Sequence, residues 1–281
     1  MTSSGRSIRS ILRENCRNFA LSVAGLLPIH PGAFEVRFLY GHSITPANRQ
    51  RFRRTLRLLR RHFEFVSNLD AVQLLRDRNP PSGRYMAFSF DDGFRDNFDL
   101  IAPTLDEVGA RACFFLVSKF IGCDEIYRRR IIEDRLHCAP DQLPMSWTMV
   151  RELQAAGFEL GAHTTDHTNL AETPFEEAVR QICVSKHVIE TECKAPCRLF
   201  AWPYGTLQHF PPALLSVVEH EFEATFSAIR SRELCSFDGA VVNRDHCEPG
   251  WPTSHVRYFV GRRKTLFAPV SRGFTGGSVS K

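Results

Sequence analysis

The sequence lacks the motifs that mark several large enzyme classes. It has no Gly-x-Ser-x-Gly nucleophile elbow, no Gly-x-x-x-x-Gly-Lys phosphate loop and no Gly-x-Gly-x-x-Gly dinucleotide fingerprint. Serine hydrolases, P-loop NTPases and dinucleotide-dependent dehydrogenases are therefore excluded. It also lacks a Cys-x-x-Cys pair, and its 9 cysteines, an odd number, are scattered from Cys16 to Cys247. We interpret them as free thiols of a reducing compartment.

Long hydrophobic runs are absent as well. The nine residues from Phe19 to Leu27 form an apolar stretch after several arginines, and Pro28 follows without a clear small-x-small cleavage site. This stretch is too short to span a bilayer. It has the outline of a signal peptide and fits an amphipathic helix on a membrane surface equally well. We predict a cytoplasmic protein, with peripheral membrane association or export through this weak signal as alternatives.

The net charge is modest, +5, but unevenly placed. Arginines cluster near the N-terminus, between residues 49 and 61, and at 128–130 and 262–264. No recognition module or interleaved aromatic pattern accompanies them, so we predict solvated helix faces and no nucleic-acid partner. Attraction to an anionic glycan or to anionic lipid headgroups stays open.

The length and the alternation of patterns favour one catalytic α/β domain. With 281 residues and 43% hydrophobic content, the chain can form one barrel-sized domain. A strand-like run at Glu35 to Leu39 precedes a helical pattern at Arg49 to Phe63, and a helical pattern at Pro174 to Glu192 precedes a short strand at Glu223 to Ser227. Such alternation predicts a parallel sheet or barrel. We place the domain at residues 36–260, between a basic and apolar extension (1–35) and a flexible, basic, glycine-rich tail (261–281).

Two short motifs resemble the halves of a metal site. Asp91 and Asp92 follow the apolar run Tyr85 to Phe90, and the next residue is a glycine that allows a sharp turn. His163 and His167 follow a second apolar run. Parallel α/β enzymes place their chemistry beyond the carboxyl ends of the strands. Two imidazoles and one carboxylate are enough to hold a zinc ion and leave positions open for water and substrate.

Each motif alone is a weak signal. Asp-Asp-Gly is most often a solvated turn, because Asp and Gly both favour turns. Most His-x-x-x-His pairs are surface or core histidines. The combination is stronger, since both motifs follow strand-like runs and a third element in a similar position, Leu199 to Gly205, lies downstream.

These segments occur in the order, and with the neighbours, seen in the NodB-homology polysaccharide deacetylases. Ser89 to Gly93 resembles the family's Thr/Ser-Phe-Asp-Asp-Gly motif, His163 to His167 its His-Ser/Thr-x-x-His motif, and Pro203 to Gly205 the end of its third motif. The resemblance runs from about Arg37 to about Arg244. It implies an α/β fold, a distorted (β/α) barrel with about seven strands. It also implies a hydrolase that removes acetyl groups from N-acetylated sugars or polysaccharides.

The resemblance further implies a role for each motif residue. Asp92, His163 and His167 would bind a divalent metal, with Zn²⁺ as the default and Co²⁺, Ni²⁺ or Fe²⁺ as alternatives. Asp91 would accept the proton of the attacking water. The metal and the backbone N–H of Tyr204 would hold the oxyanion, and the two neighbours of Tyr204 would contact the substrate.

Two features depart from the family pattern. Many members carry an Arg two residues before the Pro of the third motif, where it orients the catalytic Asp, and this chain has Ala201 there. Arg198 or Arg244 could supply the missing cation. The family's terminal Leu-x-His motif, whose His protonates the leaving amine, has no clean copy. The candidates are His246 and His255, and we favour His246 because it follows a strand-like run. Either could be a surface histidine instead.

Two functions from different classes remain. The first is a metal-dependent deacetylase, or a related amide or ester hydrolase, acting on an N-acetylated glycan or lipid-linked sugar. The second is a catalytically silent carbohydrate-binding relative. Retention of Asp91 and Asp92 together with both histidines favours the enzyme, because a binding module needs no base beside its metal ligands. Ala201 and the missing terminal motif keep the silent relative open. We expect the charged segment Gly122 to Pro144, predicted to be irregular, to select the substrate.

Overall fold

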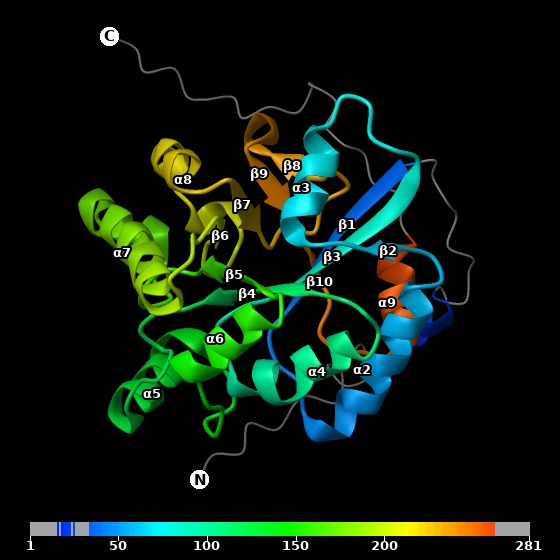
Figure 1. The fold of residues 1–281 in the computed structure, drawn as a ribbon, viewed down its shortest axis with the longest axis horizontal. Helices are drawn as coiled ribbons and strands as arrows, with labels where there is room; N and C mark the ends of the chain where they lie inside the picture. Colours follow the sequence, from blue (N-terminus) through cyan, green and yellow to red (C-terminus); the bar gives the residue numbers. More distant parts are fainter. Residues whose placement is uncertain (1–15, 17, 24, 26–33, 262–281) are drawn as a thin grey trace.

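The computed structural model of the protein describes residues 16, 18–23, 25 and 34–261. Most of the predicted N-terminal extension, and all of the predicted C-terminal tail except Gly261, lie outside these residues. One curled sheet forms the centre, in the order β10-β1-β3-β4-β5-β6-β7-β9-β8 with β2 paired to β3, and helices pack around it (Figure 1). The strands are β1 (Phe34–Gly41), β2 (Glu64–Phe65), β3 (Gly83–Phe90), β4 (Ala112–Leu116), β5 (Glu159–Ala162), β6 (Leu199–Ala201), β7 (Ala224–Ser227), β8 (Cys235–Ser236), β9 (Val241–Asn243) and β10 (Asp245–His246).

The sheet is parallel except for the pairing of β8 with β9. Its central strands are buried on both faces: residues 85–90 of β3 and all of β4 are buried. Strands covered on both faces read as continuous apolar runs, which is why the sequence shows them without alternation.

Residues 241–246 close the sheet into a distorted barrel. β9 pairs with β7 through Val242 and Phe226, whereas β10 pairs with β1 through Asp245 and Leu39. Arg244 joins the two short strands, so one stretch of chain pairs with β7 at its start and with β1 at its end. The ring consists of β1, β3, β4, β5, β6, β7 and this stretch. The predicted distorted barrel of about seven strands is confirmed.

The helices cover the outside of the sheet. The predicted helix at Arg49 to Phe63 is α2, which begins three residues earlier because Pro46 occupies its first turn. The predicted helix at Pro174 to Glu192 is α7, shifted by one residue. None of the described helices is long and apolar enough to cross a bilayer. They are α2 (Pro46–Leu59), α3 (Asn68–Arg76), α4 (Ala102–Asp106), α5 (Glu125–Ile131), α6 (Trp147–Ala155), α7 (Phe175–Cys193), α8 (Leu215–Glu221) and α9 (Thr253–Val260).

The segment Gly122 to Pro144 was predicted to be irregular, but it is helical over residues 125–136 and irregular only on either side of them. It contains α5 and a π-helical turn at Ile132–Leu136. The side chain of Asp124 caps α5 by accepting a hydrogen bond from the N–H of Tyr127. The buried Ile131 anchors the segment in a small apolar cluster that is separate from the main core.

Candidate active site

A buried cluster of one carboxylate and two imidazoles lies beyond the carboxyl ends of β3 and β5. The Oδ1 atom of Asp92 is 3.6 Å from Nε2 of His163 and 3.4 Å from Nε2 of His167. Asp92 has a positive φ of 76°, and Gly93 follows with φ 85°. This left-handed turn re-aims the chain after the strand, so that both Asp91 and Asp92 line one cavity. The three residues predicted as metal ligands, Asp92, His163 and His167, therefore lie together, and we call them the metal cluster.

The chemistry of this cluster fits a divalent cation. The ligand atoms lie within 4.8 Å of one another, and the buried Oδ1 of Asp92 has no hydrogen-bond partner. Burial raises the pKa of Asp92 to about 7 and lowers that of His163 to about 4, so the histidine is neutral at pH 7. Nδ1 of His163 lies 2.6 Å from the carbonyl oxygen of Ala201, to which it can donate. That bond leaves the Nε2 lone pair free for a metal.

Asp91 is held by Arg244 in a buried, two-point ion pair. Nη1 and Nη2 of Arg244 donate to Oδ1 and Oδ2 of Asp91 over 2.7 and 2.8 Å, and Nε donates to the carbonyl oxygen of Ser227 over 2.9 Å. Burial alone would raise the pKa of Asp91, but the charge and the hydrogen bonds of Arg244 hold it below its usual value. Of the two cations suggested by the sequence, Arg198 instead pairs with Glu223 on the surface.

A second polar cluster, which we call the His42 relay, consists of His42, Glu248 and His246. Oε1 of Glu248 lies 2.6 Å from Nδ1 of His42 and 2.7 Å from Nε2 of His246. His42 and Glu248 line the cavity that contains Asp91, whereas His246 does not, and its ring stacks on Tyr40 instead. His42 was not predicted as a site residue, although it follows a strand-like run as the other site residues do. His255, the other predicted candidate, lies on α9 and contacts Ser22.

One cavity of about 350 Å³ lies at the carboxyl ends of the strands, and it is lined by the metal cluster, Asp91, His42 and Glu248. Tyr204 and Gly205 from the third motif line it, and both have a φ of 61°. The ring of Tyr204 lies 4.9 Å from that of His167. Pro203 is buried beside them but does not line the cavity.

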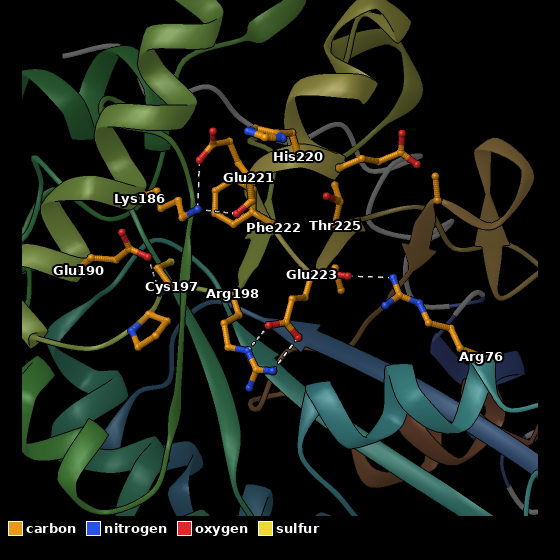
Figure 2. A pocket seen from close by; sticks show the side chains of 14 residues that line it. Arg76, Lys186, Glu190, Cys197, Arg198, His220, Glu221, Phe222, Glu223 and Thr225 are labelled. Atoms are coloured by element: carbon orange, nitrogen blue, oxygen red, sulfur yellow. Dashed lines mark hydrogen bonds and ion pairs between the residues drawn. The ribbon is translucent and has the colours of Figure 1, made fainter.

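A larger cavity of about 580 Å³ lies at the opposite end of β6 and β7 (Figure 2). Its cations Lys186 and Arg198 each pair with a glutamate, as the dashed lines in Figure 2 show. Within the described residues, the two groupings of three His or carboxylate ligands that could hold an ion lie elsewhere, in the metal cluster and the His42 relay. The smaller cavity is therefore the candidate active site.

Solved structures with the same fold include IcaB from Ammonifex degensii (TM-score 0.64, 19% identity, 82% of this chain and 100% of that chain). A Streptococcus pyogenes deacetylase, PplD, in complex with acetate has a TM-score of 0.61 at 14% identity, covering 81% of this chain and 97% of that chain. A de-N-acetylase from Aggregatibacter actinomycetemcomitans has a TM-score of 0.59 at 16% identity, covering 80% and 99%. At these identities the likeness shows the fold alone.

Among curated proteins, YxkH of Bacillus subtilis (strain 168), whose name places it with the polysaccharide deacetylases, is 21% identical over 143 residues. The match spans 51% of this chain and 45% of YxkH, less than half the length of that relative. The family model described as polysaccharide deacetylase matches residues 78–222, more than half of the 281 residues. The matched segment contains both carboxylates, both metal-type histidines and the third motif. The chain therefore belongs to the polysaccharide deacetylase family.

Proposed function

We propose that this protein is a metal-dependent hydrolase that removes acetyl groups from an N-acetylated polysaccharide or glycan. The observation that carries the proposal is the pair of adjacent carboxylates with separate partners. Asp92 faces two histidines, whereas Asp91 is held by Arg244. A metal ligand and a base are thus available side by side, as hydrolysis of an amide by activated water requires.

Asp92, His163 and His167 would hold the ion. Two imidazoles and one carboxylate make Zn²⁺ the default, with Co²⁺, Ni²⁺ and Fe²⁺ as alternatives. A bound divalent cation would supply positive charge that acidifies water and polarises the acetyl carbonyl. Asp91 would accept the proton of the attacking water, because Arg244 keeps it ionised and oriented. The backbone N–H of Tyr204 would donate to the developing oxyanion.

The leaving amine needs a proton, and His42 is the best-placed donor. It lines the cavity, and Glu248 binds its ring Nδ1. Burial alone would lower its pKa, but Glu248 and the charges of Asp92 and Asp91 raise the pKa of His42 to about 9. The hydrogen bond to Glu248 thus favours the protonated imidazole. This geometry favours His42 over His246 for the role predicted from the sequence, and we assign His246 to holding Glu248 in place.

The alternative of a silent carbohydrate-binding relative rested on the alanine at position 201 and on the missing terminal Leu-x-His motif. Arg244 supplies the cation that Ala201 cannot, so this reason for inactivity disappears. For the missing terminal motif, we propose that His42 supplies the proton instead.

The first test is the metal content per chain of the wild type and of a His163→Ala/His167→Ala variant, measured by elemental analysis. We expect about one divalent ion in the wild type and almost none in the variant. The second test is acetate release from N-acetylglucosamine oligomers, with Asp91→Asn as the inactive control. His42→Ala should reduce kcat by about 10²- to 10⁴-fold, and His246→Ala by less. A wild type that binds no metal after Zn²⁺ or Co²⁺ is supplied would contradict the proposal.

A further inference from the structure

We propose that the substrate carries an anionic group, a carboxylate or a phosphate, beside the acetylated sugar, and that Arg135 binds this group. The inference rests on the proposed function, because it places the anion in the same cavity as the reacting acetamide. It concerns the choice of substrate and not the chemical step.

Arg135 is fixed in the wall of the active-site cavity. It lies in the π-helical turn after α5 and lines the cavity together with Asp91 and Asp92. Its Nη1 donates to the carbonyl oxygen of Asp166 over 2.5 Å and to Oγ1 of Thr168 over 2.9 Å. Both acceptors belong to the loop that carries His167. The guanidinium is therefore held in place before any ligand arrives.

Arg135 is also close to the expected reaction centre. The hydroxyl of Tyr204 donates to the carbonyl oxygen of Arg135 over 3.3 Å, and the ring of Tyr204 lies 4.9 Å from that of His167. A single tyrosine ring thus separates the backbone of Arg135 from a metal ligand. A group bound by this guanidinium would belong to the acetylated sugar itself or to the next sugar in the chain.

In the part of the chain that the structure describes, the carboxylates near the cavity are engaged elsewhere and not with Arg135. Asp91 pairs with Arg244, Asp92 faces two histidines, and Glu248 bonds to His42 and His246. Among the described residues no carboxylate forms an ion pair with Arg135. Its Nε and Nη2 atoms make no hydrogen bond there, and neither is a buried, unsatisfied atom. In the opposite cavity, Lys186 and Arg198 have glutamate partners, whereas Arg76 donates to the backbone carbonyl oxygen of Glu223 (Figure 2).

An arginine with two free donor positions in a cavity matches a planar carboxylate or a phosphate, because the guanidinium presents parallel N–H groups to two oxygens. Such a charge-assisted contact is stronger within a partly enclosed cavity than on an open surface. A neutral sugar would offer this cation only hydroxyl and amide acceptors and no opposing charge. The cavity therefore favours an anionic saccharide over a neutral one.

The test compares kcat/KM for three matched N-acetylated oligosaccharides: one neutral, one with a carboxylate on or next to the acetylated sugar, and one with a phosphate there. The enzymes are the metal-loaded wild type, Arg135→Gln, Arg135→Lys and Arg129→Gln. Arg129 is the matched control, because it belongs to the same segment, is 75% exposed and does not line the cavity. Calorimetric binding of the same oligosaccharides gives a readout that does not depend on turnover.

We expect the wild type to prefer one anionic substrate and Arg135→Gln to lose about 10- to 100-fold in kcat/KM for it, with less than about a threefold change for the neutral one. Arg135→Lys should retain part of the preference, Arg129→Gln all of it, and added salt should weaken it. A wild type without preference, or an Arg135→Gln variant that loses equally on all three substrates, would overturn the proposal. If the wild type turns over none of them, the proposed function fails. The calorimetric data then test the role of Arg135 separately. Selective binding of an anionic oligosaccharide that depends on Arg135 supports the proposed anion subsite, and no such binding overturns it.

Discussion

Replacement of Arg244 by methionine tests the ion pair on which the proposed base depends. Arg244 is completely buried, and its guanidinium donates to both oxygens of Asp91, to Oγ of Ser89 and to the carbonyl oxygen of Ser227. The guanidinium also lies 4.6 Å from the ring centre of Tyr40. Methionine has a similar length but offers no donor, so the substitution removes the charge while filling most of the volume.

The magnitude follows from the burial of both partners. Breaking a buried, well-formed ion pair costs about 3–5 kcal/mol, because the remaining charge is left without compensation. Arg244→Met should therefore lower the free energy of unfolding by about 3–5 kcal/mol, and Asp91→Asn should lower it by a similar amount. The double variant removes both charges, so its loss should be smaller than the sum by about 2–3 kcal/mol.

The measurement is urea unfolding of the four proteins at neutral pH with chelator present, so that metal binding does not contribute. Arg198→Met is the control, because its pair with Glu223 is 46% and 49% exposed and should contribute at most about 1 kcal/mol. Additive effects of Asp91→Asn and Arg244→Met, within about 0.5 kcal/mol, would refute the coupling. So would a loss for Arg244→Met no larger than that of the control.

Two further predictions concern stability. Burial is the largest influence on Asp96 and raises its pKa to about 6, although Gln142 donates to it. A carboxyl group with a raised folded-state pKa destabilises the fold as pH rises from about 4 to about 6. Asp96→Asn should therefore raise the free energy of unfolding by up to about 2–3 kcal/mol at pH 7 and leave it unchanged at pH 4. Urea unfolding at both values checks this, and an equal effect at both would contradict it. A Cβ added at Gly161 would lie 2.4 Å from ring carbons of the buried Phe115, so Gly161→Ala should cost about 1–3 kcal/mol in thermal unfolding measurements, and an unchanged Tm would contradict this.

The metal cluster was predictable because its residues form contiguous motifs directly after buried strands. Strands such as β3 are long apolar runs, and polar residues at their exits are visible without knowledge of the fold. The two carboxylates and two histidines therefore pointed to one edge of a sheet. The sequence did not show the backbone conformation at Asp92, whose positive φ lets the adjacent carboxylates contact different partners.

Features that depend on distant pairs were harder to predict. Glu248 binds His42 across 206 positions of sequence, and nothing near either residue signals the other. The helix α5 was missed for a local reason. Its run of arginines at 128–130 and the 83% exposed Ile126 break the apolar periodicity by which amphipathic helices are recognised.

The alanine at position 201 shows why a departure from a motif need not mean loss of a role. The backbone carbonyl of Ala201 binds His163, a contact that any residue could make. Its side chain is buried among apolar residues of the barrel interior, including Phe226. The cation that orients the base arrives instead from Arg244, at the junction of the two short strands that close the barrel. Because the carboxyl ends of all these strands converge on one cavity, a different strand can supply the same charge to Asp91, and only the folded chain reveals which one does.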